Sequence, residues 1–181
     1  MTQALPLPSL ELASQRLHGG ETTSVQLTEQ ALARTMSGEG PKVFTRVFQG
    51  AALAEARASD VLRAAGLARS PIEGLPVSVK DLFDIAGFPT LGGSRLLADA
   101  PPALRTAEVV QRLRQAGAVI VGTTNMTEFA YSGLGINPHY GTPRNPWQRD
   151  EDVGRIPGGS SSGAAISLTD GMAMAAIGSD T

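Results

Sequence analysis

The sequence contains no cysteine, which excludes disulfides, thiolate-bound metals and thiol catalysis within it. It has two histidines, His18 and His139, too few for a metal site built from several imidazoles. No apolar run reaches the length of a membrane span, and no basic segment leads into an apolar one at the start. A formal net charge of -2 indicates no basic surface for nucleic acid or anionic lipid. These absences predict a cytoplasmic protein with no metal, no cofactor, no membrane contact and no direct nucleic-acid partner.

The residues that are present are typical of one domain. With 181 residues, of which 41% are hydrophobic and 18% charged, the chain can bury a substantial core. Apolar periodicity and turn residues predict helices over 8–18, 23–34, 51–67, 106–115, 125–131 and 161–169, and strands over 43–48, 75–79, 118–121 and 173–177. This alternation favours an α/β fold. We expect a single domain over residues 1–181, with a helical region in 1–70 and the start of an α/β core in 71–181.

Two of the expected helices carry signals for their first residue. Thr23 followed by Gln26 has the form of a capping box, in which each side chain bonds the backbone N–H of the other residue. Thr106 is a good N-cap residue and is expected to start the helix over 106–115.

One stretch near the end of the sequence carries the strongest chemical signal. Residues 154–163 include three consecutive serines, Ser160, Ser161 and Ser162, with glycines on both sides. Glycines let the backbone adopt conformations that side chains forbid and let another group approach closely. Such a loop cradles an anion, presents hydroxyls to a reacting centre, or serves as a flexible linker. The core-forming sequence that follows it directly favours a loop within a domain.

Further motifs precede and follow this loop in a fixed order. They are the stretches Gly74-Leu75-Pro76-Val77-Ser78-Val79-Lys80-Asp81, Gly117-Ala118-Val119-Ile120-Val121-Gly122-Thr123-Thr124-Asn125-Met126, Asn145-Pro146-Trp147 and Gly178-Ser179-Asp180-Thr181. Together they resemble the signature of the amidase signature family of serine hydrolases, and such a set is far more specific than a lone glycine-rich loop. The resemblance is close from about residue 72 to 181 and loose before it. It implies an amidase-signature fold, a mixed β-sheet flanked by helices, of which this sequence is the N-terminal part.

The resemblance also implies a mechanism, hydrolysis of a carboxamide C–N bond by two serines and a lysine. In such enzymes the lysine of the Val-Lys-Asp motif is the base, which is Lys80 here. Ser160, preceded by an unusual cis peptide bond, would relay to it the proton of the nucleophilic serine. Family spacing places that nucleophile roughly three residues beyond Thr181. By itself the 181-residue chain is therefore not expected to hydrolyse amides.

Supporting roles follow from the same resemblance. Ser161 would hold the loop by hydrogen bonds, Thr181 would begin the oxyanion turn, and Tyr131 would line the acyl pocket. The residues alone leave the role of Lys80 open, because a lysine that closes an apolar strand is usually a solvated charge. It can serve as a base only where burial or nearby positive charge lowers its pKa.

Other functions remain as alternatives to a stand-alone amidase that acts on a small-molecule amide as a homodimer. The glutaminase component of a tRNA-dependent amidotransferase shares these motifs and would need the other amidotransferase subunits as partners. A nucleotide-binding module would use the glycine-rich loop as a phosphate cradle, although the loop lacks the Gly-Lys-Ser/Thr ending of phosphate-binding loops. A non-catalytic fragment with a binding role is the last alternative.

Overall fold

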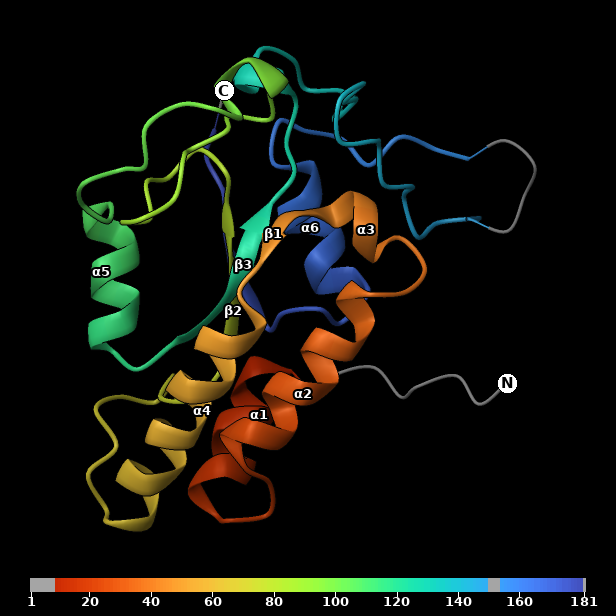
Figure 1. Ribbon diagram of the computed structural model, residues 1–181. Helices are drawn as coiled ribbons and strands as arrows, with labels where there is room; N and C mark the ends of the chain where they lie inside the picture. The colour runs from red at the N-terminus through yellow and green to blue at the C-terminus, as the bar shows by residue number, and fades with distance from the viewer. Residues whose placement is uncertain (1–8, 150–153, 181) are drawn as a thin grey trace.

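A four-stranded mixed sheet lies at the centre of the computed structural model, which describes residues 9–149 and 154–180 (Figure 1). The helices are α1 (Leu10–His18), α2 (Ser24–Thr35), α3 (Gly40–Val43), α4 (Gln49–Ala64), α5 (Glu108–Gln115) and α6 (Ser162–Thr169). The strands are β1 (Phe44–Val47), β2 (Pro76–Lys80), β3 (Val119–Thr124) and β4 (Ala175–Ile177). Two 3-10 turns, η1 (Arg95–Leu97) and η2 (Glu128–Ala130), lie in the connections. The α/β class and the mixed sheet with flanking helices are as the sequence predicts.

The strand order in the sheet is β1-β3-β2-β4. β2 runs parallel to both β3 and β4, whereas β1 runs antiparallel to β3. Every residue of β2 and β3 is buried, which explains the continuous apolar run over residues 118–121 that marks β3 in the sequence. The register places Lys80 opposite Thr124 at the carboxyl ends of these two strands.

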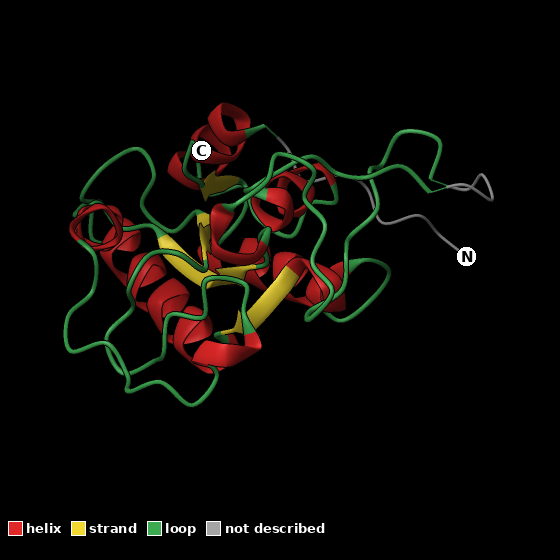
Figure 2. Cartoon of the chain, turned by 90° about the horizontal axis from the view of Figure 1, so that it is seen from above, coloured by secondary structure: helices red, strands yellow, loops and turns green. Residues whose placement is uncertain are grey.

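Helices cover both faces of the sheet, and each face has its own hydrophobic cluster (Figure 2). On one face, Val119 and Val121 of β3 pack in a cluster with residues of α2, α4 and α6. On the other face, Val77 and Val79 of β2 pack in a cluster that includes Val110 of α5. This division follows from the alternation of side chains along a strand, which points neighbouring residues to opposite faces.

The first helices pack beside the sheet, and their capping is largely as the sequence predicts. A third cluster joins Ala13 and Leu17 of α1 to Leu27 of α2 and to Leu75. The capping box at Thr23 is confirmed, because its side chain accepts from the Gln26 N–H while the Gln26 side chain accepts from the Thr23 N–H. β1 lies within residues 1–70 and pairs with β3, which lies within residues 71–181, so both regions contribute strands to the sheet. The division of the chain into these two regions stays a prediction.

Two local predictions are wrong. Thr106 does not cap α5, whose N-cap is Ala107, because the Thr106 hydroxyl accepts instead from the Ala86 N–H at 3.0 Å. The helix expected over residues 125–131 is reduced to the turn η2, in which Phe129 has a positive φ of 50°. Its backbone N–H donates to the carbonyl of Gly92 at 2.8 Å, so a contact distant in sequence replaces the helical bond.

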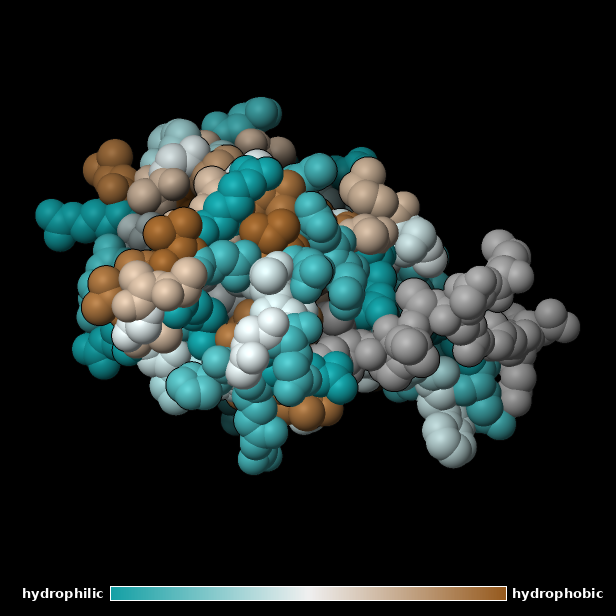
Figure 3. All heavy atoms as spheres, turned by 90° about the horizontal axis from the view of Figure 1, so that it is seen from below, coloured by the Kyte–Doolittle hydropathy of each residue, from teal (hydrophilic) through white to brown (hydrophobic). Residues whose placement is uncertain are grey.

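The surface mixes apolar and polar residues. On the face shown in Figure 3, hydrophobic residues form patches interrupted by hydrophilic ones. Within residues 9–149 and 154–180, no helix combines the length and the hydropathy that a membrane crossing requires.

Candidate active site

Three parallel strands end at one edge of the sheet, and polar side chains gather there. β2 ends at Lys80, β3 at Thr124 and β4 at Ile177. Crevices outside the carboxyl ends of parallel strands are the usual ligand sites of α/β folds. The Gly/Ser loop, residues 157–163, reaches this edge because α6, which follows it, packs against β2, β3 and β4. The sequence motifs therefore meet in space.

Lys80 lies fully buried at the end of β2. Its Nζ donates to Ser160 Oγ at 2.6 Å and to Ser179 Oγ at 2.8 Å. Burial lowers the pKa of the Lys80 ammonium, because a poorly solvated surrounding disfavours the charged form. The amine is thus closer to its neutral, basic form than an exposed lysine would be, and its two hydroxyl partners fix where it points.

Backbone bonds hold the Gly/Ser loop against this lysine. The peptide bond between Gly159 and Ser160 is cis, and Ser160 is 1% exposed. The Ser160 carbonyl accepts from the Thr127 N–H at 3.0 Å, and the Gly159 N–H donates to the Gly133 carbonyl at 2.8 Å. A Cβ on Gly159 would lie 2.6 Å from the backbone nitrogen of Gly135, so this approach requires glycine.

The two serines after Ser160 differ in their partners. Ser161 Oγ donates to the Ser179 carbonyl at 3.1 Å and accepts from the Ser179 N–H at 3.2 Å, so it ties the loop to the segment after β4. Ser162 Oγ is buried and has no hydrogen-bond partner among the residues that the structure describes. Thr181, which the resemblance assigns to the oxyanion turn, lies outside the described residues.

Ser179 is a site residue that the sequence reasoning missed. It contacts the buried lysine through its hydroxyl and Ser161 through both of its backbone groups. The motif Gly178-Ser179-Asp180-Thr181 could have indicated this role. Its serine directly follows β4, which ends at the same sheet edge as the strand that carries Lys80. Ser179 therefore joins the lysine and the Gly/Ser loop into one hydrogen-bonded group.

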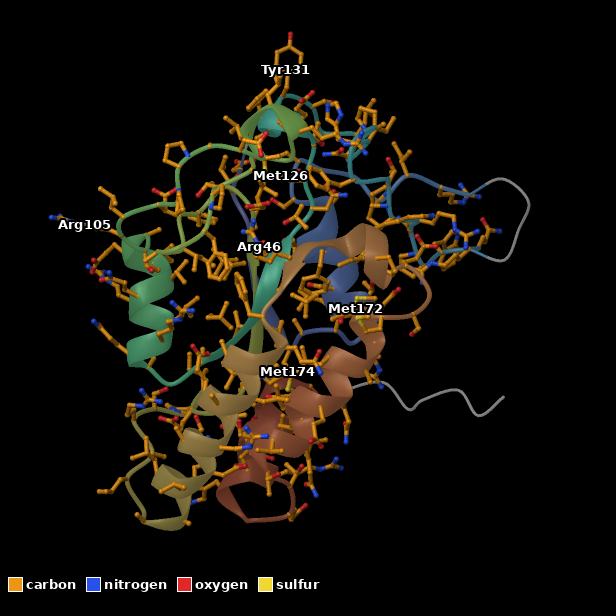
Figure 4. All side chains as sticks on the ribbon, in the orientation of Figure 1. Arg46, Arg105, Met126, Tyr131, Met172 and Met174 are labelled. Carbon is orange, nitrogen blue, oxygen red and sulfur yellow. The ribbon has the colours of Figure 1, made fainter. Side chains whose placement is uncertain are left out.

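Tyr131 does not reach this group in the described residues. Its side chain points outward at the top of the molecule (Figure 4), and the residue is 93% exposed. Met126, which precedes it in the same connection, is fully buried. A role of Tyr131 in an acyl pocket stays a prediction.

Asp81 supports the segment that follows the lysine. Its N–H donates to the Thr124 carbonyl at 3.0 Å, and its Oδ1 accepts from the Leu91 N–H at 3.2 Å. Burial raises the pKa of this carboxyl group, because the charged form is poorly solvated. Asp81 therefore acts as a brace between the end of β2 and the loop beyond it.

The site contains hydroxyls, an amine and backbone groups, but no cluster of metal ligands. In the described part of the chain, no group of three or more His, Cys, Asp or Glu side chains is placed to hold a metal ion. A buried amine within hydrogen-bond distance of a serine hydroxyl is the arrangement needed to move a proton between them.

Comparisons with known proteins agree on one family. A profile of the Amidase family matches residues 26–181. The chain is 45% identical over 163 residues to the AtzE component of 1-carboxybiuret hydrolase from Pseudomonas sp. (strain ADP), an alignment that covers 90% of this chain and 35% of that protein. It is 41% identical over 174 residues to one of the subunits of the Glutamyl-tRNA(Gln) amidotransferase of Chloroflexus aggregans, covering 96% of this chain and 35% of that relative.

Solved structures give the same result. The native peptide amidase of Stenotrophomonas maltophilia matches with a TM-score of 0.78 and 32% identity, over 93% of this chain and 35% of that one. The chain thus spans about a third of the length of these relatives. The match of the family profile over most of the sequence, together with this shared fold, shows that the chain belongs to the amidase signature family.

Proposed function

We propose that the protein containing this chain hydrolyses the C–N bond of a small carboxamide, with Lys80 as base and Ser160 as proton relay. The observation that carries the proposal is the 2.6 Å hydrogen bond between Lys80 Nζ and Ser160 Oγ, made inside the protein by a lysine whose pKa is lowered by burial. A serine–lysine pair of this kind can replace the serine–histidine pair of other hydrolases.

In the proposed reaction, the nucleophile is a serine that follows Thr181 in the family pattern. Its Oγ attacks the amide carbonyl carbon while its proton passes to Ser160 Oγ and the Ser160 proton passes to Lys80 Nζ. The oxyanion then collapses, the C–N bond breaks, and the same relay returns a proton to the leaving amine. Water, activated by the same groups, releases the acid from the acyl-enzyme.

Two features of the site favour this relay. Lys80 Nζ also lies 2.8 Å from Ser179 Oγ, so in the neutral amine one N–H can donate to Ser179 while the lone pair accepts from the Ser160 hydroxyl, the reverse of the bond that a charged ammonium donates to Ser160. The carbonyl of Ser160 is held by the Thr127 N–H, so the backbone that carries the hydroxyl is fixed beside Lys80. Preorganisation of this kind lowers the cost of proton transfer in the transition state.

The glutaminase component of a tRNA-dependent amidotransferase is the second candidate. It is favoured by the 41% identity to the Chloroflexus aggregans relative over 96% of this chain. Under this candidate the substrate is the glutamine side-chain amide and the partners are the other amidotransferase subunits. A homodimer and a cytoplasmic location stay the predictions for a stand-alone enzyme.

The nucleotide-binding alternative gains no support from the loop. The N–H groups of Gly159 and Gly163 donate to the carbonyls of Gly133 and Asn125, at 2.8 and 2.9 Å. A phosphate cradle needs such N–H groups free to point at the ligand.

The test is release of ammonia by the full-length protein from acetamide, benzamide and glutamine. Ammonia released from any of these by the protein alone supports a stand-alone amidase. Release from glutamine that requires added amidotransferase subunits supports the second candidate. No ammonia above the blank under either condition would contradict both.

A further inference from the structure

Asn137 is a buried amide that joins three connections around the site. It is 1% exposed, and its Nδ2 donates to the Gly93 carbonyl at 2.8 Å and the Met126 carbonyl at 2.7 Å. Its Oδ1 accepts from the N–H groups of His139 and Tyr140, at 2.8 and 2.9 Å. Both donors and both acceptor positions of the side chain are therefore used.

The bond from Asn137 Nδ2 to the Met126 carbonyl connects Asn137 to the Gly/Ser loop through one peptide unit. The carbonyl of Met126 and the N–H of Thr127 belong to the same planar peptide unit. Asn137 holds the carbonyl end of this unit, and the N–H end donates to the Ser160 carbonyl at 3.0 Å. Hydrogen bonds in such a chain polarise and strengthen one another. The side chain of Asn137 thus bonds one end of the peptide unit whose other end holds the backbone of Ser160.

The other donor of Asn137 reaches the connection that leaves β2. Gly93 follows the segment braced by Asp81, and its φ is +70°. A Cβ on Gly93 would lie 2.7 Å from the Met126 carbonyl oxygen and 2.9 Å from Asn137 Nδ2, which shows how tightly these groups pack. The amide therefore links the connection after Lys80 to the peptide unit that holds Ser160.

We propose that Asn137 is a positioning residue for the reaction, which sets Ser160 Oγ against Lys80 Nζ through the Met126–Thr127 peptide unit. This inference rests on the proposed function for its kinetic consequence. Asparagine suits the position because two donors and two acceptors are needed there, and an ionised aspartate offers no donor. Asn137 has no contact with the reacting atoms themselves in this arrangement.

The variants Asn137→Asp and Asn137→Ala in the full-length protein test the proposal. We expect kcat to fall about 10- to 100-fold while KM changes by less than about twofold, because a misplaced relay affects the transition state more than binding. Ser59→Ala is the matched control: Ser59 is also 1% exposed and donates to Glu73 Oε1 at 2.5 Å, and Glu73 precedes the opposite end of β2. The control should lower the urea midpoint and leave kcat within about twofold.

Hydrogen exchange of the Thr127 N–H separates this inference from the proposed function. In Asn137→Ala the exchange of that N–H should accelerate at least about tenfold, and in Ser59→Ala it should not change. If the wild type cleaves no amide, the proposed function fails but the exchange still decides whether Asn137 fixes this peptide unit. Unchanged Thr127 exchange in Asn137→Ala, or a kcat loss no greater than that of the control, would overturn the proposal.

A second variant covers the event that neither Asn137 variant folds. Gly93→Ala keeps the asparagine but places a methyl group 2.9 Å from Asn137 Nδ2 and 2.7 Å from the Met126 carbonyl oxygen, so one of these groups must shift. It should accelerate Thr127 exchange and lower kcat in the same way. Wild-type exchange and kcat in a folded Gly93→Ala protein would count against the proposal.

Discussion

The three consecutive serines of the Gly/Ser loop give a graded prediction, because each hydroxyl has different partners. Ser160 Oγ accepts from Lys80 Nζ, Ser161 Oγ bonds both backbone groups of Ser179, and Ser162 Oγ has no partner in the described residues. Each serine is replaced by alanine in the full-length protein. The change removes one oxygen in every case, so each variant is a control for the other two.

The expected losses follow from these contacts. Ser160→Ala removes the proposed proton relay, and general acid–base catalysis of this kind is worth about 10²- to 10⁴-fold in kcat. Ser161→Ala removes two hydrogen bonds of about 1 kcal/mol each, a total of about 2 kcal/mol. If this whole loss appears in the transition state, kcat/KM falls about 30-fold, since about 1.4 kcal/mol corresponds to a factor of ten. Ser162→Ala removes an unpaired hydroxyl and should stay within about twofold of the wild type.

The assay is kcat/KM for ammonia release, with urea unfolding of each variant to confirm the fold. The prediction is most specific in the order of the losses in kcat/KM. The loss should be greatest for Ser160→Ala, intermediate for Ser161→Ala and near zero for Ser162→Ala. A Ser162→Ala loss as large as that of Ser161→Ala, or a Ser160→Ala protein with wild-type turnover, would refute the reasoning.

Two further predictions concern pH and stability. Burial lowers the pKa of Lys80, and in the proposed mechanism its neutral amine is the base. We therefore expect kcat/KM to rise with pH and to level off below the range in which an exposed lysine deprotonates, which a pH–rate profile checks. Arg69→Met should lower the free energy of unfolding, measured in urea, by about 3 kcal/mol, because it leaves the buried carboxylate of Glu73 without its ion-pair partner. Adding Glu73→Gln removes that unpaired charge and should recover part of the lost free energy of unfolding.

The central strands and the placement of the lysine could be predicted from the sequence. Short, largely apolar segments that end in polar residues mark β2 and β3, and parallel strands bring such ends together. The motif order adds the Gly/Ser loop to the same edge. These signals are local, or repeat over a few residues, so sequence alone shows them. The pairing of Lys80 with Ser160, which lie in hydrogen-bond contact in the structure, follows from the resemblance to the amidase signature family and not from these local signals.

The connections could not be predicted in the same way. The segment over residues 125–131 has helix-forming composition, yet its N–H groups at Thr127 and Phe129 bond the carbonyls of Ser160 and Gly92. Thr106 has the side chain of a cap but bonds the Ala86 N–H. In each case a partner distant in sequence outweighs a local preference of about 1 kcal/mol. The roles of Ser179 and Asn137 depend on such distant partners too.

Replacement of the two lysines of the sequence, one at a time, tests the central claim most directly. Lys80→Met in the full-length protein removes the buried amine and keeps an unbranched apolar side chain of similar length. Lys42→Met is the matched control, because the Lys42 side chain is 48% exposed and pairs with Glu39 at 3.7 Å. We predict that Lys80→Met lowers kcat/KM at least about 100-fold and that Lys42→Met changes it less than about twofold. Wild-type turnover in Lys80→Met would contradict the account.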